Sequence, residues 1–324
     1  MHAKAAIMSS KVVDLALDST DKKEIAEFKH QIHGHGGILS ACGDKVILKQ
    51  LIAREHKFYE ESLNHPLVQT FLPKYYGSVK LDESVIEDAT KNLEFPIDLT
   101  GVETRSKDQF ICLENIVHGF ENPCIADIKM GKQMYDLDAS PEKVATMLAK
   151  MKGRTISHIG FSISGISRPG EHRFDRQWLH KLDLKTVVTE GLVPYFEMAE
   201  TKVSPDYRCF VIEQFISEVT KYRNIIAKSE TRMFCGSLLL VYDVSKSKYE
   251  RYLAGDKGVC SVGRPDADPA SSPDSFQSPL VNMRAIDFGH GHWLPGKGPD
   301  DQYLFGLDNF IRILREILNG EYEH

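Results

Sequence analysis

Two opposite charges interrupt an apolar stretch of this chain. The segment NPCIADIKMGKQMYD covers residues 122–136, and Asp127 and Lys129 stand inside its apolar part. Alternate residues of a strand point to the same face, so a strand here would direct the carboxylate and the ammonium group to one side. Burying such charges costs several kcal/mol each unless something compensates them. Either the two side chains form a structural salt bridge, or both face a site that binds something charged.

A second candidate is Asp287, in the segment IDFGH at 286–290. It follows an apolar run and precedes an aromatic residue and a glycine. An aspartate at a strand end suits Mg²⁺, which prefers oxygen ligands and needs one or two protein carboxylates when nucleotide phosphates supply the others. The other interpretation is a turn aspartate that caps the following segment.

Lys49 is a third candidate because it ends the apolar run KVILK. A lysine at this place is commonly solvated. In kinases, a strand lysine can instead contact nucleotide phosphates and pair with a helix glutamate. Glu55 is the available partner in the following helix, but the short spacing argues against that pair.

A basic stretch is the fourth candidate. Between Ala139 and Gly170 the only acidic residue is Glu142, whereas five residues are lysine or arginine. Lys143 and Lys150 lie seven residues apart and therefore share one face of a helix. Lys143 would stand in the first helical turn, where the macrodipole disfavours a cation. The stretch is either a solvated helix face or a docking site for an anion.

Composition limits the classes of function. The chain has 324 residues, enough for one large or two modest domains with a real core. Its net charge of −6 argues against general binding to nucleic acid or to a membrane surface. The first twenty residues contain too short an apolar stretch for a membrane span. We therefore expect no direct nucleic-acid partner and no membrane span, while protein partners stay open.

The cysteines indicate a reducing compartment. The six cysteines form no CxxC pair. Scattered cysteines within apolar runs are typical of reduced thiols in a protein core. We expect such core thiols at Cys112, Cys124, Cys209 and Cys235, and a cytoplasmic or nuclear location, or both.

Hydrophobic periodicity predicts a strand-rich first part, up to about residue 120, and alternating helices and strands after it. Ser140 and Pro141 form a typical helix start, with serine as the N-cap, and residues 82–107 are expected to be irregular. Strands are predicted at 38–51 (two strands around a turn at Gly43 and Asp44), 74–81, 109–117, 124–130, 158–167, 235–243 and 281–290, and helices at 53–63, 141–151, 176–192, 207–226 and 303–318.

Together the motifs resemble those of the inositol polyphosphate kinases. PCIADIKMG matches the family signature Pro-x-x-x-Asp-x-Lys-x-Gly, GSLLLVYD is similar to its Ser-Leu-Leu segment, and IDFGH is similar to its metal motif. FLPKYYGSV and LEN also resemble family segments, so the similarity extends from about His30 to Leu318. The compact size most resembles the multikinase type.

The resemblance implies an α+β, two-lobed fold like that of protein kinases, which also resembles ATP-grasp proteins. It implies an antiparallel sheet in the N-lobe and a mixed α/β C-lobe with a helical substrate-binding insertion. The expected organisation is a tail at 1–25, a nucleotide-binding N-lobe at 26–120 and a C-lobe at 121–324. Within the C-lobe, 137–190 would bind the substrate and 255–280, rich in Pro, Ser and Asp, would be a mobile linker.

The resemblance also implies an ATP site between the lobes. Lys49 would contact the phosphates, and Glu114 and Ile116 would meet adenine through their backbone. Asp127 would hold the ribose, and Lys129 would contact the transferred phosphoryl group and the inositol phosphate. Asp127 and Lys129 are thus the expected catalytic residues.

The same resemblance implies which residues would bind the metal ion and the substrate. Asp287, with His290 beside it, would hold Mg²⁺. The substrate would be bound by Lys129, Lys143, Lys150, Gln177, Lys181 and His290. Two departures from the family bear on substrate specificity: a shorter loop between Lys49 and Glu55, and Met147 at a position where a polar residue can occur.

The implied reaction is transfer of the γ-phosphoryl group of ATP to a hydroxyl of inositol tris- or tetrakisphosphate. Phosphoryl transfer needs positioning and stabilisation of spread negative charge, which Lys129 and Mg²⁺ would supply. One alternative is an inositol hexakisphosphate kinase that makes pyrophosphates. Another is a non-catalytic scaffold or transcription cofactor, against which the joint presence of Lys49, Asp127, Lys129 and Asp287 argues.

Overall fold

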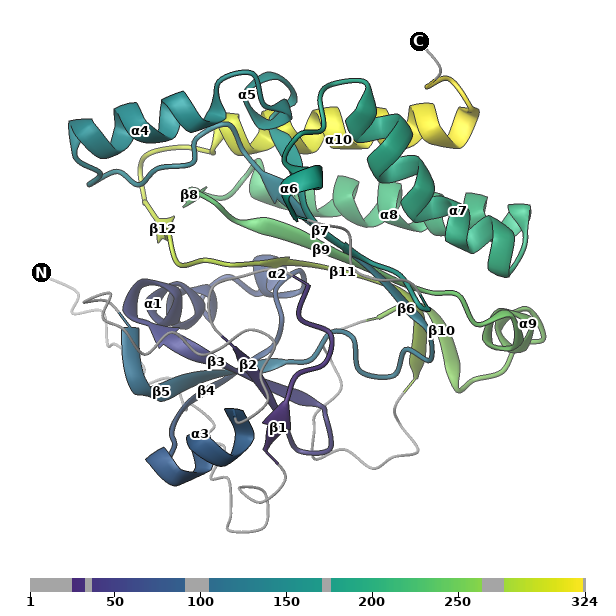
Figure 1. Cartoon of the computed structure of the whole chain (residues 1–324), viewed down its shortest axis with the longest axis horizontal. Helices are drawn as coiled ribbons and strands as arrows, with labels where there is room; N and C mark the ends of the chain where they lie inside the picture. Colours follow the sequence, from purple (N-terminus) through teal and green to yellow (C-terminus); the bar gives the residue numbers. More distant parts are fainter. Residues whose placement is uncertain (1–24, 33–36, 91–104, 171–175, 264–276, 323–324) are drawn as a thin grey trace, which may run out of the picture.

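Two five-stranded sheets form the framework of the protein (Figure 1). The computed structural model describes residues 25–32, 37–90, 105–170, 176–263 and 277–322. The predicted tail at 1–25 lies outside these residues except for Ile25. The first sheet is built from strands that end at residue 114, and the second begins at residue 123. The lobe boundary that we expect at residue 120 falls in the connection between them.

The first sheet is antiparallel throughout, in the order β1-β2-β3-β5-β4. Alternate residues of its central strand point inward, so Val46 and Leu48 are buried in a small core below the sheet. Positive φ angles at Gly43 and Asp44 form the predicted turn between β2 and β3. The elements of this half are β1 (Ala26–Glu27), β2 (Ile38–Ala41), β3 (Val46–Ile52), α1 (Ala53–Ser62), α2 (Pro66–Gln69), β4 (Tyr75–Lys80), α3 (Glu83–Thr90) and β5 (Arg105–Glu114).

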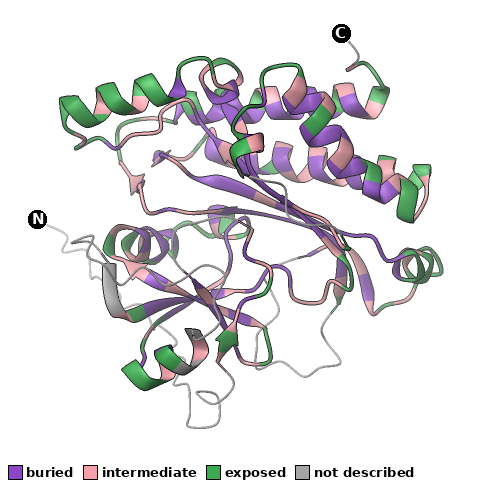
Figure 2. Ribbon diagram, viewed as in Figure 1, coloured by how far each residue is buried: buried purple, intermediate pink, exposed green. Residues whose placement is uncertain are grey.

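The second sheet is mixed, in the order β10-β11-β9-β6-β7, because β10 and β11 run parallel and the other pairs antiparallel. Three long helices, α7, α8 and α10, cover the face that points away from the first sheet (Figure 1). The strands of this second sheet are buried along most of their length (Figure 2). The strands are β6 (Pro123–Met130), β7 (Phe161–Ser167), β9 (Ser237–Asp243), β10 (Val259–Val262) and β11 (Ser278–Ile286), and the helices are α7 (Val193–Lys202), α8 (Pro205–Ile226) and α10 (Asp301–Asn319).

Smaller elements complete the C-terminal half. A two-stranded sheet pairs β8 with β12. The arrangement confirms the predicted α+β class, with an antiparallel first sheet and a mixed second one. These elements are α4 (Pro141–Met151), α5 (Thr155–Ile159), α6 (Arg176–Leu179), a π-helical turn (Val187–Leu192), β8 (Thr231–Met233), α9 (Lys246–Leu253) and β12 (Gly291–Trp293).

Several predicted elements are wrong in extent. Residues 82–107 are not all irregular, because α3 forms around Ile86, which packs into the core of the first sheet. The strand expected at 158–167 begins at Phe161, because α5 ends at Gly160, where φ is +75°. The linker expected at 255–280 is wrong at both ends, since Val259–Val262 and Ser278–Ile286 are paired strands, and residues 264–276 lie outside the described residues.

The helix expected at 176–192 is interrupted. The Asp183 carboxylate accepts hydrogen bonds from the backbone N–H groups of Lys185 and Thr186, at 3.0 and 2.8 Å. Such side-chain hydrogen bonds compete with the backbone bonds of a helix, so one helical segment ends here and a new one begins. The prediction that Cys209 is a core thiol is also wrong, because this residue is exposed on α8. Cys112 and Cys124 are buried as predicted.

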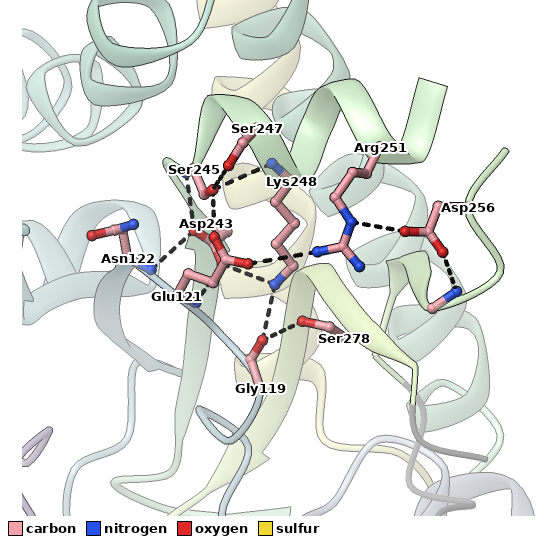
Figure 3. Close-up of polar contacts among 11 residues, drawn as sticks. Gly119, Glu121, Asn122, Asp243, Ser245, Ser247, Lys248, Arg251, Asp256 and Ser278 are labelled. Carbon is pink, nitrogen blue, oxygen red and sulfur yellow. Dashed lines mark hydrogen bonds and ion pairs between the residues drawn. The ribbon is translucent and has the colours of Figure 1, made fainter. Parts of the chain in front are cut away.

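A buried polar network fixes the connection between the two sheets (Figure 3). At the end of β9, the fully buried Asp243 carboxylate accepts hydrogen bonds from the backbone N–H groups of Glu121 and Asn122, at 2.7 and 3.0 Å. It also pairs with the Lys248 ammonium group at 2.8 Å, which donates to the Gly119 carbonyl at 3.0 Å. Burial lowers the pKa of Lys248, and Asp243 opposes that shift. The connection is therefore held against the second sheet.

In the ranges that the structure covers, no helix is both long enough and apolar enough to cross a bilayer.

Candidate active site

One pocket brings together all five residues that the sequence assigns to the nucleotide. Its lining includes Lys49 from β3, Glu114 from the end of β5, Ile116 from the connection, Asp127 from β6 and Asp287 from the end of β11. The pocket therefore takes residues from both sheets. It combines an apolar lining with a few charged side chains, as small-molecule sites commonly do.

One side of this pocket is apolar and includes the connection between the sheets. The Ile116 carbonyl accepts a hydrogen bond from the Asn282 side chain at 3.1 Å. The Glu114 carboxylate accepts one from the Lys74 backbone N–H at 3.1 Å. The Glu114 side chain is thus used within the fold, consistent with a contact to a ligand through the backbone. The apolar lining comprises Phe28, Ile32, Ile38, Ile47, Leu113, Ile116, Val117, Leu239 and Ile286.

Lys49 lies between two carboxylates. Its ammonium group is 2.8 Å from Glu55 and 2.7 Å from Asp287. The sequence argument against the Lys49–Glu55 pair is wrong, because β3 runs directly into α1 and places Glu55 in the first helical turn. Burial alone would lower the pKa of Lys49, but the two carboxylates raise it above its usual value. The lysine is therefore charged at neutral pH.

Glu55 also joins this part of the pocket to the segment after β11. Its side chain is 1% exposed, and it accepts a hydrogen bond from the Phe288 backbone N–H at 3.2 Å. Asp287 itself has φ +65°, a left-handed conformation that is uncommon outside glycine. Such conformations often occur at functional sites, where the surrounding contacts impose them.

Asp127 carries an unsatisfied carboxylate oxygen. The residue is 3% exposed, and Oδ1 is buried without a hydrogen-bond partner among the described residues. Burial raises the pKa of Asp127, Lys129 opposes the shift, and Asp287 adds to it. Within the described chain no ion pair joins Asp127 to Lys129, so the structural salt bridge considered above is not formed. An unsatisfied buried oxygen in a pocket calls for a ligand hydroxyl or a cation.

The oxygen atoms of this pocket also fit a divalent cation. Asp127 and Asp287 both line it. No group of three or more His, Cys, Asp or Glu residues is arranged for a metal ion in the portion of the chain described. A closed protein cage is therefore absent from that portion. Mg²⁺ does not need one, because it is commonly held by one or two carboxylates together with substrate phosphates.

Lys129 and Lys143 approach a common region beside this pocket. Burial raises the pKa of the Cys235 thiol, whereas the positive charges of Lys129 and Lys143 oppose the shift. Burial also lowers the pKa of His290, and Lys143 contributes to that shift. The structure therefore brings Lys129 of β6, Lys143 of α4 and His290 near one another.

Helix α4 presents a basic surface. It starts as predicted, with the Ser140 side chain accepting a hydrogen bond from the Lys143 backbone N–H at 3.3 Å. Lys143 and Lys150 are exposed. In the part of the chain that the structure covers, no carboxylate forms an ion pair with the side chains of Lys143, Lys150, Lys152 or Arg154. This unpaired positive charge fits an anion better than a salt-bridged helix face would.

Gln177 and Lys181 lie in and just after α6, and both are exposed. Trp178, between them, packs against the main core. The preceding residues 171–175 lie outside the described structure. The assignment of Gln177 and Lys181 to the substrate stays a prediction.

His290 is oriented by a contact that sequence reasoning missed. Its Nδ1 lies 2.9 Å from Oδ2 of Asp136, so Nε2 is the ring nitrogen left for a metal ion or substrate. His292 and Arg54 bind the same carboxylate. The alternation in HGH at 290–292 is a signal for the two histidines, because alternate residues of a strand point to one side. No local pattern indicates Arg54 or Asp136.

The chain is similar to known inositol phosphate kinases. The family model for inositol polyphosphate kinase matches residues 110–315. The inositol polyphosphate multikinase of Schizosaccharomyces pombe is 27% identical over 300 residues, which cover 91% of this chain and 98% of that protein. Inositol hexakisphosphate kinase 3 of Mus musculus is 30% identical over 231 residues, which cover 66% of this chain and 52% of that protein. The match thus spans about half the length of the hexakisphosphate kinase.

A solved structure shows the same fold. It is the inositol phosphate multikinase Ipk2 of S. cerevisiae in complex with ADP and Mn²⁺, with a TM-score of 0.63 and 24% identity. The match covers 85% of this chain and 99% of that chain. It confirms the two-lobed, kinase-like fold. Since the family model covers well over half of the residues and includes the signature strand and the Asp287 segment, this chain belongs to the inositol polyphosphate kinase family.

Proposed function

We propose that the protein transfers the γ-phosphoryl group of ATP to a hydroxyl of an inositol tris- or tetrakisphosphate, as an enzyme of the multikinase type. The observation that carries this proposal is the single pocket that Lys49, Asp127 and Asp287 share with an apolar wall. Kinase sites need these parts: a lysine for phosphates, carboxylates for metal and sugar, and an apolar slot for adenine. The multikinase Ipk2, solved with ADP and Mn²⁺, supports a nucleotide and a divalent cation as ligands.

ATP would lie with its adenine against the connection between the sheets. The backbone of Glu114 and Ile116 would contact the base, while the unsatisfied Oδ1 of Asp127 would accept a hydrogen bond from a ribose hydroxyl. Lys49 would neutralise charge on the phosphates as a point charge. Glu55 holds Lys49 in place, because its buried Oε1 accepts hydrogen bonds from both the Lys49 ammonium group and the Phe288 backbone N–H.

Asp287, with Nε2 of His290 nearby, would hold Mg²⁺ at the phosphates. The carboxylate oxygens described above fit this ion, which supplies electrostatic stabilisation of the transferred group when bound. Asp287, which pairs with Lys49 in this structure, would hold the ion in place of that contact or together with it. Either arrangement keeps the negative charge of the aspartate compensated.

Lys129 would act at the reacting phosphoryl group. It stands on the same strand as Asp127, and its positive charge and that of Lys143 both act on the Cys235 thiol. A charge fixed there stabilises a transition state in which negative charge spreads over the phosphoryl oxygens. Lys143 and Lys150, with Gln177 and Lys181, would bind the phosphate groups of the inositol substrate. The substrate hydroxyl is the nucleophile, and a loose transition state needs little help from a base.

An inositol hexakisphosphate kinase is the second candidate, because mouse kinase 3 of that group is 30% identical in the matched region. The two activities differ in the bond that forms: a phosphate ester on a hydroxyl, or a pyrophosphate on an existing phosphate. The multikinase reading is favoured because the match to the S. pombe multikinase covers nearly the whole of both chains.

The test is incubation of the protein with ATP, Mg²⁺ and a panel from inositol trisphosphate to hexakisphosphate, with products resolved by charge. We expect products from tris- and tetrakisphosphate and slow or no reaction with hexakisphosphate. Reaction with hexakisphosphate alone would establish the second candidate. Absence of any product with the wild-type protein would support a non-catalytic scaffold.

We also propose a cytoplasmic or nuclear location, or both. It is supported by the six free cysteines, which are typical of reducing compartments. The negative net charge supports the expectation of no direct nucleic-acid partner.

A further inference from the structure

We propose that Asp136 is a positioning residue that fixes the substrate helix α4 relative to the nucleotide pocket. Three segments meet at its carboxylate: the first turn of α1, the segment after Asp287 and the loop that leads into α4. The inference rests on the proposed function, since it assumes that α4 binds the inositol phosphate.

Both oxygens of the Asp136 carboxylate are occupied. Oδ2 accepts hydrogen bonds from Arg54 and from Nδ1 of His290, the latter at 2.9 Å. Oδ1 lies 2.8 Å from Nε2 of His292 and accepts a hydrogen bond from the Leu137 backbone N–H at 2.7 Å. The side chain is 2% exposed, so these contacts replace water almost completely. A fully satisfied buried carboxylate holds its partners in a defined geometry.

The partners of Asp136 belong to the nucleotide side of the site. Arg54 precedes Glu55, which holds Lys49 and the Phe288 backbone N–H. After Asp287, His290 immediately precedes β12 and His292 lies within it. One carboxylate therefore connects the proposed substrate helix to the residues that surround the ATP phosphates.

The other contacts of the loop that leads into α4 involve less buried groups: Arg54 binds the exposed Asp138, and the Cys235 thiol donates to the Met134 carbonyl at 3.3 Å. Among residues 132–150, all of which the structure describes, Asp136 alone is buried. The buried residue of α4 itself is Met151, at the opposite end from Lys143. Figure 2 shows most of the helix surface as exposed. The position of Lys143 relative to the phosphates is therefore set largely by Asp136.

Two other interpretations of this cluster are less suitable. A metal centre does not fit, because the carboxylate–imidazole separations are hydrogen-bond distances and no metal-binding group of three or more residues occurs in the described ranges. A purely structural ion pair would stabilise the protein without reference to the substrate. The kinetic experiment below separates that role from positioning.

The test compares Asp136→Asn with Asp138→Asn. Asp138 is the matched control, because Arg54 also binds its carboxylate at 3.0 Å but that side chain is 70% exposed. KM and kcat are measured for ATP and for an inositol trisphosphate, together with thermal melts and ADP binding by calorimetry. Misplacement of a bound substrate by about 1 Å can cost about a hundredfold in rate, so a clear effect is expected from a moved helix.

For Asp136→Asn we expect the inositol trisphosphate KM to rise at least about tenfold, with ADP affinity within about twofold of the wild type. Asp138→Asn should change neither. In a Lys143→Ala background the effect of Asp136→Asn should be much smaller, because the charge that Asp136 positions is already gone. An unchanged inositol trisphosphate KM, or full additivity with Lys143→Ala, would overturn the proposal. If the wild-type protein phosphorylates no inositol phosphate, the proposed function fails instead.

Discussion

The Lys49 ammonium group lies 2.7 Å from the Asp287 carboxylate, although 238 residues separate them in the chain. Lys49 belongs to the first sheet and Asp287 follows the last strand of the second. Their contact therefore closes the nucleotide pocket across the two sheets. Glu55 supports it from α1, because its carboxylate binds both Lys49 and the Phe288 backbone N–H.

Replacement of Asp287 by asparagine should abolish the dependence of transfer on Mg²⁺ concentration. The amide keeps the shape but loses the negative charge that Mg²⁺ prefers in its ligands. We expect a folded protein that still binds nucleotide and transfers phosphoryl groups at least about a hundredfold more slowly. Product formation is measured against Mg²⁺ concentration. A mutant with a normal Mg²⁺ response would remove the metal role from Asp287.

Replacement of Glu55 by glutamine should weaken the use of ATP. Lys49 would lose one of its two charged partners, and the segment at Phe288 would lose a charged acceptor. We expect kcat/KM for ATP to fall about tenfold or more. Glu61→Gln is the control, because that residue forms an exposed pair with Lys57 at 3.7 Å on the same helix. Equal effects of the two substitutions would show that Glu55 acts through general stability of α1.

The basic face of α4 should serve the inositol phosphate and not ATP. Lys143→Ala and Lys150→Ala should each raise the KM for inositol phosphate strongly and the KM for ATP little. The difference from wild type should shrink as salt is added, because exposed charges are screened. Since Lys143 stands in the first turn of α4, its removal should leave the free protein equally stable or slightly more stable.

Lys246→Ala, an exposed lysine of α9, is the matched control for charge removal. Its kinetics should equal those of the wild type. An unaltered inositol phosphate KM in both α4 variants would show that this helix face is solvated and does not bind the substrate. A higher KM for ATP alone would show that the basic face contacts ATP and not the inositol phosphate.

The network at the connection between the sheets should dominate local stability. Asp243→Asn leaves the fully buried Lys248 ammonium group without its charged partner, which typically costs about 3–5 kcal/mol. Denaturant unfolding measures the loss. Glu250→Gln, in an exposed pair on the same helix, should change stability little. The double variant Asp243→Asn/Lys248→Met should recover part of the loss, and an undiminished loss there would contradict the ion-pair explanation.

The residues that line the pocket could be singled out from sequence because each stands in a motif with fixed spacing. Asp127, Lys129 and Asp287 occupy strand or strand-end positions that the apolar pattern marks clearly. The same holds for the start of α4, where Ser140 caps the helix as its residue type predicts. Local patterns therefore indicate Asp127 and Asp287, which line the pocket, and Lys129 on the same strand as Asp127.

Contacts between distant segments could not be predicted in this way. Asp136 and Arg54 are 82 residues apart, and each looks like an ordinary surface charge in its own segment. The Lys49–Glu55 pair does not follow from the sequence spacing, because the direct passage from β3 into α1 depends on the three-dimensional path of the chain. The interrupted helix at 176–192 depends on Asp183, whose side chain competes with backbone bonds that periodicity alone assumes.

The central claim is that this pocket and Lys129 together transfer the γ-phosphoryl group to an inositol phosphate. Its most direct test is a single-turnover measurement with γ-³²P-labelled ATP, Mg²⁺ and an inositol trisphosphate, using the wild-type protein, Lys129→Ala and the control Lys132→Ala. We predict label in the inositol product for the wild type and the control, and transfer slowed roughly a hundredfold or more in Lys129→Ala, with both substrates still bound. Near-normal transfer by Lys129→Ala, or no labelled product with the wild type, would contradict the account.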